Sequence, residues 1–243
     1  FNRLNVGIFV LHAVLMSLFV TVPFDLVAAG LEGHEHWKVY ALVMFGALFY
    51  MLPAVHLGDR RGRSKPVFLT SVALVTASQV LLLFPARSLI GVGLALLVFF
   101  AGFMVLEAAL PAQVSRAAPA GGRGTAIAVY STVQFLGAAC GSALGGFLAQ
   151  HWGRAALLTV NLAMLLAWSI AACGMRSGNA ASIRQYPLPP LDREHAAGLR
   201  ERLHRLPGVR EAQVLAGERM AYLKVDARAF DERDVLKLIA GES

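Results

Sequence analysis

Two acidic side chains lie inside long apolar stretches of this sequence. Asp25 falls near the end of the run 6–29, and Glu107 falls near the end of the run 89–110. An ionisable group in hydrocarbon is costly to retain, so such acids are candidates for binding protons or polar solutes. A helix cap at the membrane surface, or an acid that extends its charge toward water, explains each of them equally well. Both interpretations are open from the sequence.

Asp25 has polar neighbours at helical spacing. Ser17, Thr21 and Asp25 follow one another at steps of four, which places them on one face of a helix. This stripe is a candidate surface for contact with a solute. His12 lies five residues before Ser17 and points roughly 140° away from the stripe, so we expect it to be a packed, neutral histidine.

A second patterned face lies in the fifth apolar run. Tyr130 and Gln134 are one helical turn apart and are candidates for lining a cavity or for coupling, as are the intramembrane acids. Further along, Gly137, Gly141 and Gly145 recur at intervals of four. That spacing predicts a smooth helix face that a neighbouring helix can approach closely.

Metal and redox chemistry have little support. His34, Glu35 and His36 are adjacent and do not converge without further ligands, so they indicate a hydrated loop. Cys140 and Cys173 lie in apolar runs and are expected to be small packing residues. There is also no Ser/His/Asp set and no phosphate-binding glycine loop. We therefore expect no metal, no cofactor, no catalytic residue and no enzymatic activity.

The composition indicates that lipid surrounds most of the chain. Hydrophobic residues make up 57% and charged residues 15%, against about 25% charged in an ordinary soluble domain. Six apolar runs are near the ~20 residues that a helix needs to cross the hydrocarbon core. They are residues 6–29, 38–57, 67–84, 89–110, 125–149 and 155–175. Pro23 is expected to kink or break the end of the first, and residues 111–123 are expected to form a loop.

Basic residues give the orientation. The turn Gly58-Asp59-Arg60-Arg61-Gly62-Arg63 is too short for a domain and joins two spans, which is typical of the cytoplasmic side. With the N-terminus inside, the inner segments carry nine Lys or Arg residues and the outer segments three. Both ends are thus expected in the cytoplasm, with helical repeats at 6–84 and 89–175. The net charge of +7 is explained by topology, because residues 192–243 are neutral, and nucleic acid is not an expected partner.

The C-terminal segment has the pattern of a soluble domain. After a polar linker at residues 177–190, helices are predicted at 192–206 and 231–240, the second capped by Asp231, and strands at 209–215 and 220–225. Residues 183–188 are a possible earlier strand. We therefore expect a small α+β domain over residues 191–243, marginal in size on its own.

The turn resembles the motif A loop of the major facilitator superfamily, in its second-half copy between helices eight and nine. The stretches Leu106–Pro111 and Arg123–Ala126 resemble the helix-ten to helix-eleven region of these transporters. Tyr130–Gly137, with the glycines that follow, is similar to their helix eleven. The resemblance covers about residues 1–176 and implies the C-terminal half of an all-α bundle of transmembrane helices.

The tail resembles the ferredoxin-like domain found at the C-terminus of YajR-type transporters, through Leu206–Val209 and Tyr222–Asp226. That fold is related to heavy-metal-associated domains, whose metal loop carries a Cys-x-x-Cys pair. The tail here has no cysteine, so metal binding is not implied. The sequence given also departs from that fold by ending directly after the second predicted helix.

The resemblance implies secondary active transport, as a proton-driven antiporter that exports small molecules from a bacterial inner membrane. It implies that Asp59, within the glycine frame of the loop, takes part in gating; topology charges alone are the alternative. A chain that opens on Phe1 is expected to lack an N-terminal half, which would be a partner along with lipid, substrate and protons. The tail is expected to regulate gating. A non-transporting receptor with the tail as its signalling module remains the rival interpretation.

Overall fold

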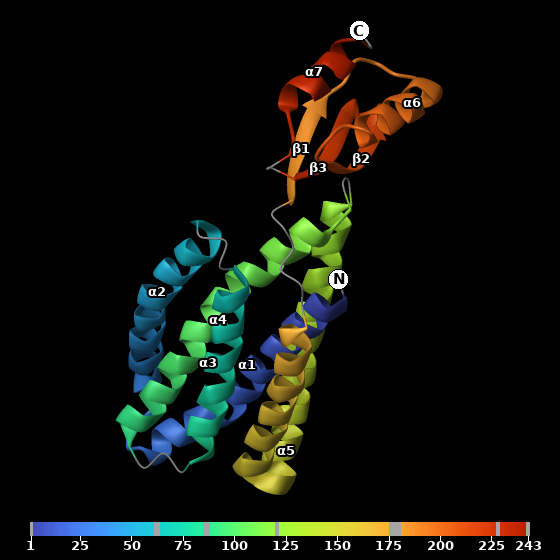
Figure 1. The fold of residues 1–243 in the computed structure, drawn as a ribbon. Helices are drawn as coiled ribbons and strands as arrows, with labels where there is room; N and C mark the ends of the chain where they lie inside the picture. The colour runs from blue at the N-terminus through green and yellow to red at the C-terminus, as the bar shows by residue number, and fades with distance from the viewer. Residues whose placement is uncertain are drawn as a thin grey trace. The chain divides into compact units, whose positions relative to one another are not determined.

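The computed structural model describes residues 2–60, 64–84, 88–119, 122–174, 181–226 and 229–241, without the side chains of residues 59, 60, 181–183 and 193. The chain divides into two compact units (Figure 1). One unit combines residues 1–113 with 129–177, and the other combines residues 114–128 with 178–243.

Long apolar helices build the first unit. They are α1 (Asn2–Ala28), α2 (His36–Arg60, preceded by the short helix η1 at Gly33–Glu35), α3 (Ser64–Leu83), α4 (Leu89–Ala117) and α5 (Arg123–Cys173). In the described part of the chain, these five helices are long and apolar enough to cross a membrane. The chain is thus mostly helical, as the hydropathy pattern predicts.

The helix α5 is too long for one crossing. Its 51 residues would span about 75 Å as a straight helix, more than twice the ~30 Å of hydrocarbon. Gly153 interrupts it with φ 78° and ψ 174°, a conformation that a residue with a Cβ rarely adopts. A Cβ at Gly145 would lie 3.5 Å from Leu157 Cδ1, so the arms before and after Gly153 lie side by side. Six crossings remain a prediction, with α5 counted as two.

Prolines do not end these helices. The expected loop at 111–123 is partly wrong, because α4 continues through Pro111 to Ala117 and takes up half of it; the membrane span 89–110 stays a prediction. Pro23 likewise lies inside α1. A proline removes one backbone hydrogen bond, and inside a membrane protein the neighbouring helices can compensate for that loss.

The helix α1 is the centre of the bundle. Of its most apolar stretch 61% is buried, against 17% for α2, which lies at the periphery. The first arm of α5 packs directly on α1 through Gly137, Gly141 and Gly145: added Cβ atoms there would lie 2.4 Å from Phe9 O, 2.2 Å from Ala13 O and 2.9 Å from Ser17 Cα. The glycine face therefore meets α1.

The second unit contains the soluble tail, whose elements follow the order βαββα. They are β1 (Ala181–Pro187), α6 (Arg193–His204), β2 (Val209–Leu215), β3 (Met220–Asp226) and α7 (Glu232–Ala240), with the short helix η2 at Ala216–Glu218. The strands form an antiparallel sheet in the order β1-β3-β2. The expected linker at 177–190 is therefore partly wrong, since β1 pairs along its whole length with β3 and belongs to the domain.

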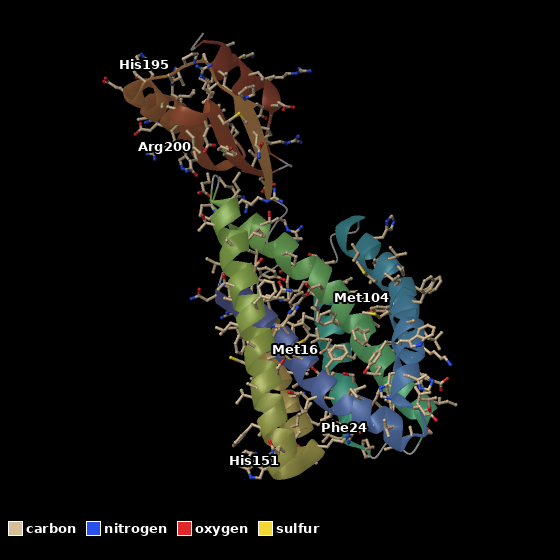
Figure 2. The ribbon with its side chains drawn as sticks, turned by 180° about the vertical axis from the view of Figure 1, so that it is seen from behind. Met16, Phe24, Met104, His151, His195 and Arg200 are labelled. Carbon is tan, nitrogen blue, oxygen red and sulfur yellow. The ribbon has the colours of Figure 1, made fainter. Side chains whose placement is uncertain are left out.

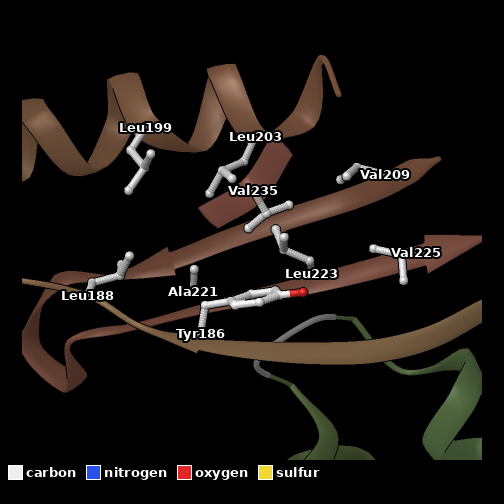
Figure 3. Packing of buried hydrophobic residues seen from close by; sticks show 9 residues of the cluster. All are labelled: Tyr186, Leu188, Leu199, Leu203, Val209, Ala221, Leu223, Val225 and Val235. Carbon is white, nitrogen blue, oxygen red and sulfur yellow. The ribbon is translucent and has the colours of Figure 1, made fainter. Parts of the chain in front are cut away.

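Alternating burial explains how the tail packs. Residues of β3 alternate between buried and half-buried, so one face of the sheet meets α6 and α7. Figure 3 shows the core between them: Tyr186, Leu188, Leu199, Leu203, Val209, Ala221, Leu223, Val225 and Val235. Asp231 caps α7 as predicted, accepting from Arg233 N at 2.9 Å. Asp192 caps α6, and the backbone N–H of His195 lowers the pKa of that carboxyl.

Candidate functional site

Three helices bring together an acid, an amide and an imidazole inside the bundle. The Nε2 atom of Gln134, from α5, lies 2.8 Å from Nε2 of His12 on α1 and 3.1 Å from Oε1 of Glu107 on α4. His12 and Glu107 are themselves 3.6 Å apart, measured from Nε2 to Oε2. Met16 and Met104, labelled in Figure 2, mark the helices that supply His12 and Glu107. We name these three residues the polar triad.

The contacts of the triad indicate which nitrogen of His12 carries a hydrogen and where the two N–H groups of the Gln134 amide point. His12 Nδ1 lies 3.3 Å from the Ile8 carbonyl, which only accepts, so Nδ1 carries the proton. The Nε2 atom of His12 then has a free lone pair and accepts one N–H of the Gln134 amide. The second N–H of that amide goes to Glu107. This arrangement fits a neutral His12.

A further proton would change this pattern. A proton on His12 Nε2 would face the Gln134 amide donor, so the amide would have to turn or the imidazolium would have to move toward Glu107. A proton on Glu107 Oε2 fits without rearrangement, because that atom is buried and has no hydrogen-bond partner among the described residues. The Glu107 side chain is 38% exposed while that of His12 is 10% exposed. A proton therefore reaches the triad from the side of Glu107.

A second buried polar cluster connects α1, α3 and the second arm of α5. Ser17 Oγ donates to Asn161 Oδ1 at 2.9 Å, and Asn161 Nδ2 donates to Gln79 Oε1 at 3.3 Å. All three residues are buried, as is Thr21, whose hydroxyl donates to Leu18 O at 3.4 Å. The structure therefore places Ser17 and Thr21 in the interior of this unit, where Ser17 connects α1 to the second arm of α5 and Thr21 bonds within its own helix.

Asp25 lies apart from the triad and has its own partner. Arg154, the residue after the break in α5, places Nε 2.7 Å from Asp25 Oδ1 and donates from Nη2 to Leu82 O at 2.5 Å. One guanidinium thus joins the ends of α1 and α3 to the start of the second arm of α5. This geometry is that of a structural clamp.

The motif A-like turn stays a prediction. Gly58 is buried near the end of α2, and the backbone of Asp59 and Arg60 is helical. The side chains of Asp59 and Arg60, and all of Gly62 and Arg63, lie outside the described residues. Their role in gating has no structural description here.

Sequence reasoning missed part of this chemistry. It assigned His12 to packing, and it did not single out Gln79 or Asn161. The available signal was the residue type, because ionisable and amide side chains inside apolar runs are rare and expensive. Arg154, one of the three basic residues in the predicted outer segments, was not singled out, since it lies 129 positions from Asp25.

Comparison with known proteins defines the class. The family described as Major Facilitator Superfamily matches residues 4–216. The chain therefore belongs to the Major Facilitator Superfamily, and this membership points to a membrane transporter and not to an enzyme.

Individual relatives agree with this assignment. The Escherichia coli protein named inner membrane transport protein YajR is 31% identical over 237 residues, which is 98% of this chain and 52% of that protein. An uncharacterized transporter of Buchnera aphidicola from Acyrthosiphon pisum is 28% identical over 137 residues, covering 56% of this chain and 35% of the relative. A second Buchnera transporter, from Baizongia pistaciae, is 26% identical over 174 residues, covering 70% and 44%. The chain spans about half the length of the curated relatives it matches, or less.

Proposed function

We propose that this chain is the C-terminal half of a secondary transporter of the bacterial inner membrane, which couples proton movement to the export of a small molecule. The order of its family motifs and its similarity to a protein named as an inner membrane transporter support this proposal. The direction of transport rests on the family resemblance alone.

The observation that carries proton coupling is the position of the Gln134 amide between His12 and Glu107. A charged Glu107 is stabilised by one amide N–H, and a neutral His12 accepts the other. The two titratable groups therefore share one rigid hydrogen-bond donor. Binding a proton at Glu107 removes the negative charge that the Gln134 amide contacts, and binding it at His12 forces the amide to turn, so either event alters the contacts among α1, α4 and α5.

Alternating access requires two states that differ in their affinity for the proton. In inverted-repeat transporters, one helical half moves against the other around a site near the middle of the membrane. We propose that protonation of the triad favours one of these states, with the absent half supplying the opposing surface. Six spans with both ends of this chain in the cytoplasm, and gating by Asp59 and its basic neighbours, complete the proposal.

The tail domain is proposed to influence the cytoplasmic end of α4. Residues 114–128 and the tail form one compact unit, and Lys224 Nζ of β3 donates to the carbonyl of Ala118 at 3.3 Å. A cation at this carbonyl, directly after α4, complements the negative end of the helix dipole. Removal of residues 192–243 should therefore change transport; unchanged transport, expression and stability would remove the regulatory role.

The proton site can be tested without knowing the substrate. We would reconstitute the intact protein in lipid vesicles and record charge displacement after a pH jump, together with the infrared band of protonated carboxyl groups. Glu107→Gln should abolish the carboxyl band and strongly reduce the charge displacement. Glu35→Gln, which removes an acid paired with Lys38 outside the triad, is the matched control and should change neither. Charge displacement that persists in full in Glu107→Gln would contradict the site, and none in the native protein would favour the receptor interpretation.

A further inference from the structure

The tail domain contains an open cleft between α6 and the end of β2. The cleft has a volume of about 540 Å³, which falls in the range of ~300–1,000 Å³ that is usual for small-molecule sites. Its lining comes from Ala196, Ala197 and Arg200 on α6 and from residues 214–218 of β2 and η2. Strand β2 lies at the edge of the sheet, so the cleft is reached from solvent beside that edge.

Small side chains keep this cleft open. Ala196, Leu199 and Leu203 share the buried face of α6, and the two leucines fill the core of the tail. Ala196 takes the same face about one turn earlier, but its side chain is too short to cover the end of β2. On the opposite rim, a Cβ added at Gly217 would meet no atom within 4 Å. The cleft therefore follows from the residue sizes at both rims.

Arg200 supplies the cleft with a cation that has no acidic partner among the described residues. The ion pairs on α6 join His195 to Asp192 and Arg205 to Glu201, and Arg200 takes part in neither. Its guanidinium is exposed and is labelled on α6 in Figure 2. Because the planar N–H groups of a guanidinium match the two oxygens of a carboxylate, Arg200 is suited to bind a carboxylate ligand.

Glu218 supplies an anion to the same cleft. Tyr222 donates its hydroxyl to Glu218 Oε2 at 3.2 Å, which holds the carboxylate in place and leaves Oε1 for a ligand. A simple anion would be repelled by Glu218, and a simple cation would be repelled by Arg200. The lining also offers the apolar side chains of Val214 and Leu215. A molecule that carries both charges on an apolar body therefore matches the cleft.

We propose that the cleft of the tail binds a small zwitterion with an apolar body, either a free apolar amino acid or a short apolar peptide. Arg200 binds its carboxylate, Glu218 binds its ammonium group, and Val214 and Leu215 contact its apolar part. The amino acid and the peptide share this chemistry and differ in the spacing of their charges, so the test includes both. The inference concerns the tail alone and does not depend on proton uptake at the triad.

The first test is binding to the intact protein in lipid nanodiscs, measured by ligand-observed NMR titration. The probes are leucine and leucyl-leucine, each also as its N-acetyl form, which lacks the ammonium group, and as its amide, which lacks the carboxylate. We expect at least one zwitterion to bind, and both of its derivatives to bind about three- to tenfold more weakly, as for ion pairs open to solvent. Absence of binding by either probe, or equal affinity for the three forms, would overturn the inference.

Arg200→Gln tests which residue binds the carboxylate. This variant should weaken binding of the zwitterion about three- to tenfold and leave binding of the amide unchanged, because the amide has no carboxylate to lose. Arg205→Gln is the matched control, since it removes a cation of the same helix that is paired with Glu201. It should affect neither ligand. An equal loss for the zwitterion and the amide in Arg200→Gln would mean that Arg200 supports the fold and would overturn its assignment to the ligand.

A bulky side chain should close the cleft without disturbing the core. Ala197 is exposed and lines the cleft, so Ala197→Phe should abolish binding. Gly198→Phe is the control, because it adds the same side chain at the next exposed position of α6, outside the lining. That variant should bind as the unmodified protein does. Binding that survives in Ala197→Phe would place the ligand elsewhere in the chain and overturn the inference, while the proposed proton site would stand.

Discussion

Arg154 holds Asp25 through an ion pair of 2.7 Å, although the two residues lie 129 positions apart in the sequence. The side chains are 28% and 14% exposed, so the pair is largely shielded from water. The same guanidinium donates to the last turn of α3 at Leu82 O. Asp25 and Arg154 therefore connect the end of α1, the end of α3 and the start of the second arm of α5.

This relationship predicts a loss of stability when either partner is removed. Arg154→Ala leaves a largely buried carboxylate unpaired and should cost on the order of 3 kcal/mol. The cost would be measured as a lower unfolding temperature of the purified protein, with size-exclusion chromatography used to monitor the folded fraction. The double variant Asp25→Leu with Arg154→Leu should recover much of it, because no charge is left unpaired. If Arg154→Ala unfolded at the same temperature as the unmodified protein, the ion pair would contribute nothing to stability.

The glycine face of α5 predicts that alanine substitutions on this helix differ in their effect on stability. Gly141→Ala would place a methyl group 2.2 Å from the Ala13 carbonyl oxygen, so α1 and α5 must separate. We expect a loss of about 1–3 kcal/mol, typical of overpacking, measured as a lower unfolding temperature. Gly146→Ala is the control, because its methyl group would meet no atom within 4 Å. That variant should be neutral or slightly stabilising, since alanine is the better helix former. Equal losses at the two sites would contradict close packing as the cause.

The sequence predicts the elements of this chain better than their contacts. Long apolar runs identify the helices, because length and hydropathy are local properties that the membrane enforces. The strands of the tail are predicted by alternating apolar and polar residues. The cap at Asp231 is predicted by its position directly before a helical pattern. Pro111 shows where a local rule fails, since α4 continues through it to Ala117.

The candidate site was recoverable only in part. Glu107, Tyr130 and Gln134 stood out by type and spacing, but the link between Gln134 and His12 joins residues 122 positions apart. Such a contact depends on which face α1 turns toward α5, and that is decided by the packing of Gly137, Gly141 and Gly145. A single sequence shows the smooth glycine face but not the helix that meets it.

The second polar cluster predicts a stability effect that leaves proton uptake unchanged. Asn161→Leu keeps the volume but leaves the side-chain carbonyl of Gln79 without its donor, while the Ser17 hydroxyl keeps only its bond to Val14 O. We expect a loss of about 1–3 kcal/mol, while the pH midpoint of the Glu107 band stays the same. Ser142→Ala is the control, because that hydroxyl donates to Ala138 O of its own helix. A shifted midpoint in Asn161→Leu would mean that the two clusters act as one network.

The tail has a buried phenol that predicts instability at high pH. Tyr186 donates to Glu232 Oε1 at 3.0 Å, and burial together with this carboxylate raises the pKa of Tyr186 to about 12, above its ordinary value of 10.0. Because the folded state favours the protonated phenol, the contribution is complete below pH 10 and is lost as the pH rises toward 12. Calorimetry of the intact protein should show the tail transition falling across that window. Tyr186→Phe should remove this pH-dependent loss, which amounts to on the order of 2 kcal/mol of unfolding free energy. Tyr222→Phe, at an exposed hydrogen bond to Glu218, should have a much smaller effect. A steep fall that survives in Tyr186→Phe would assign the alkaline transition to other groups.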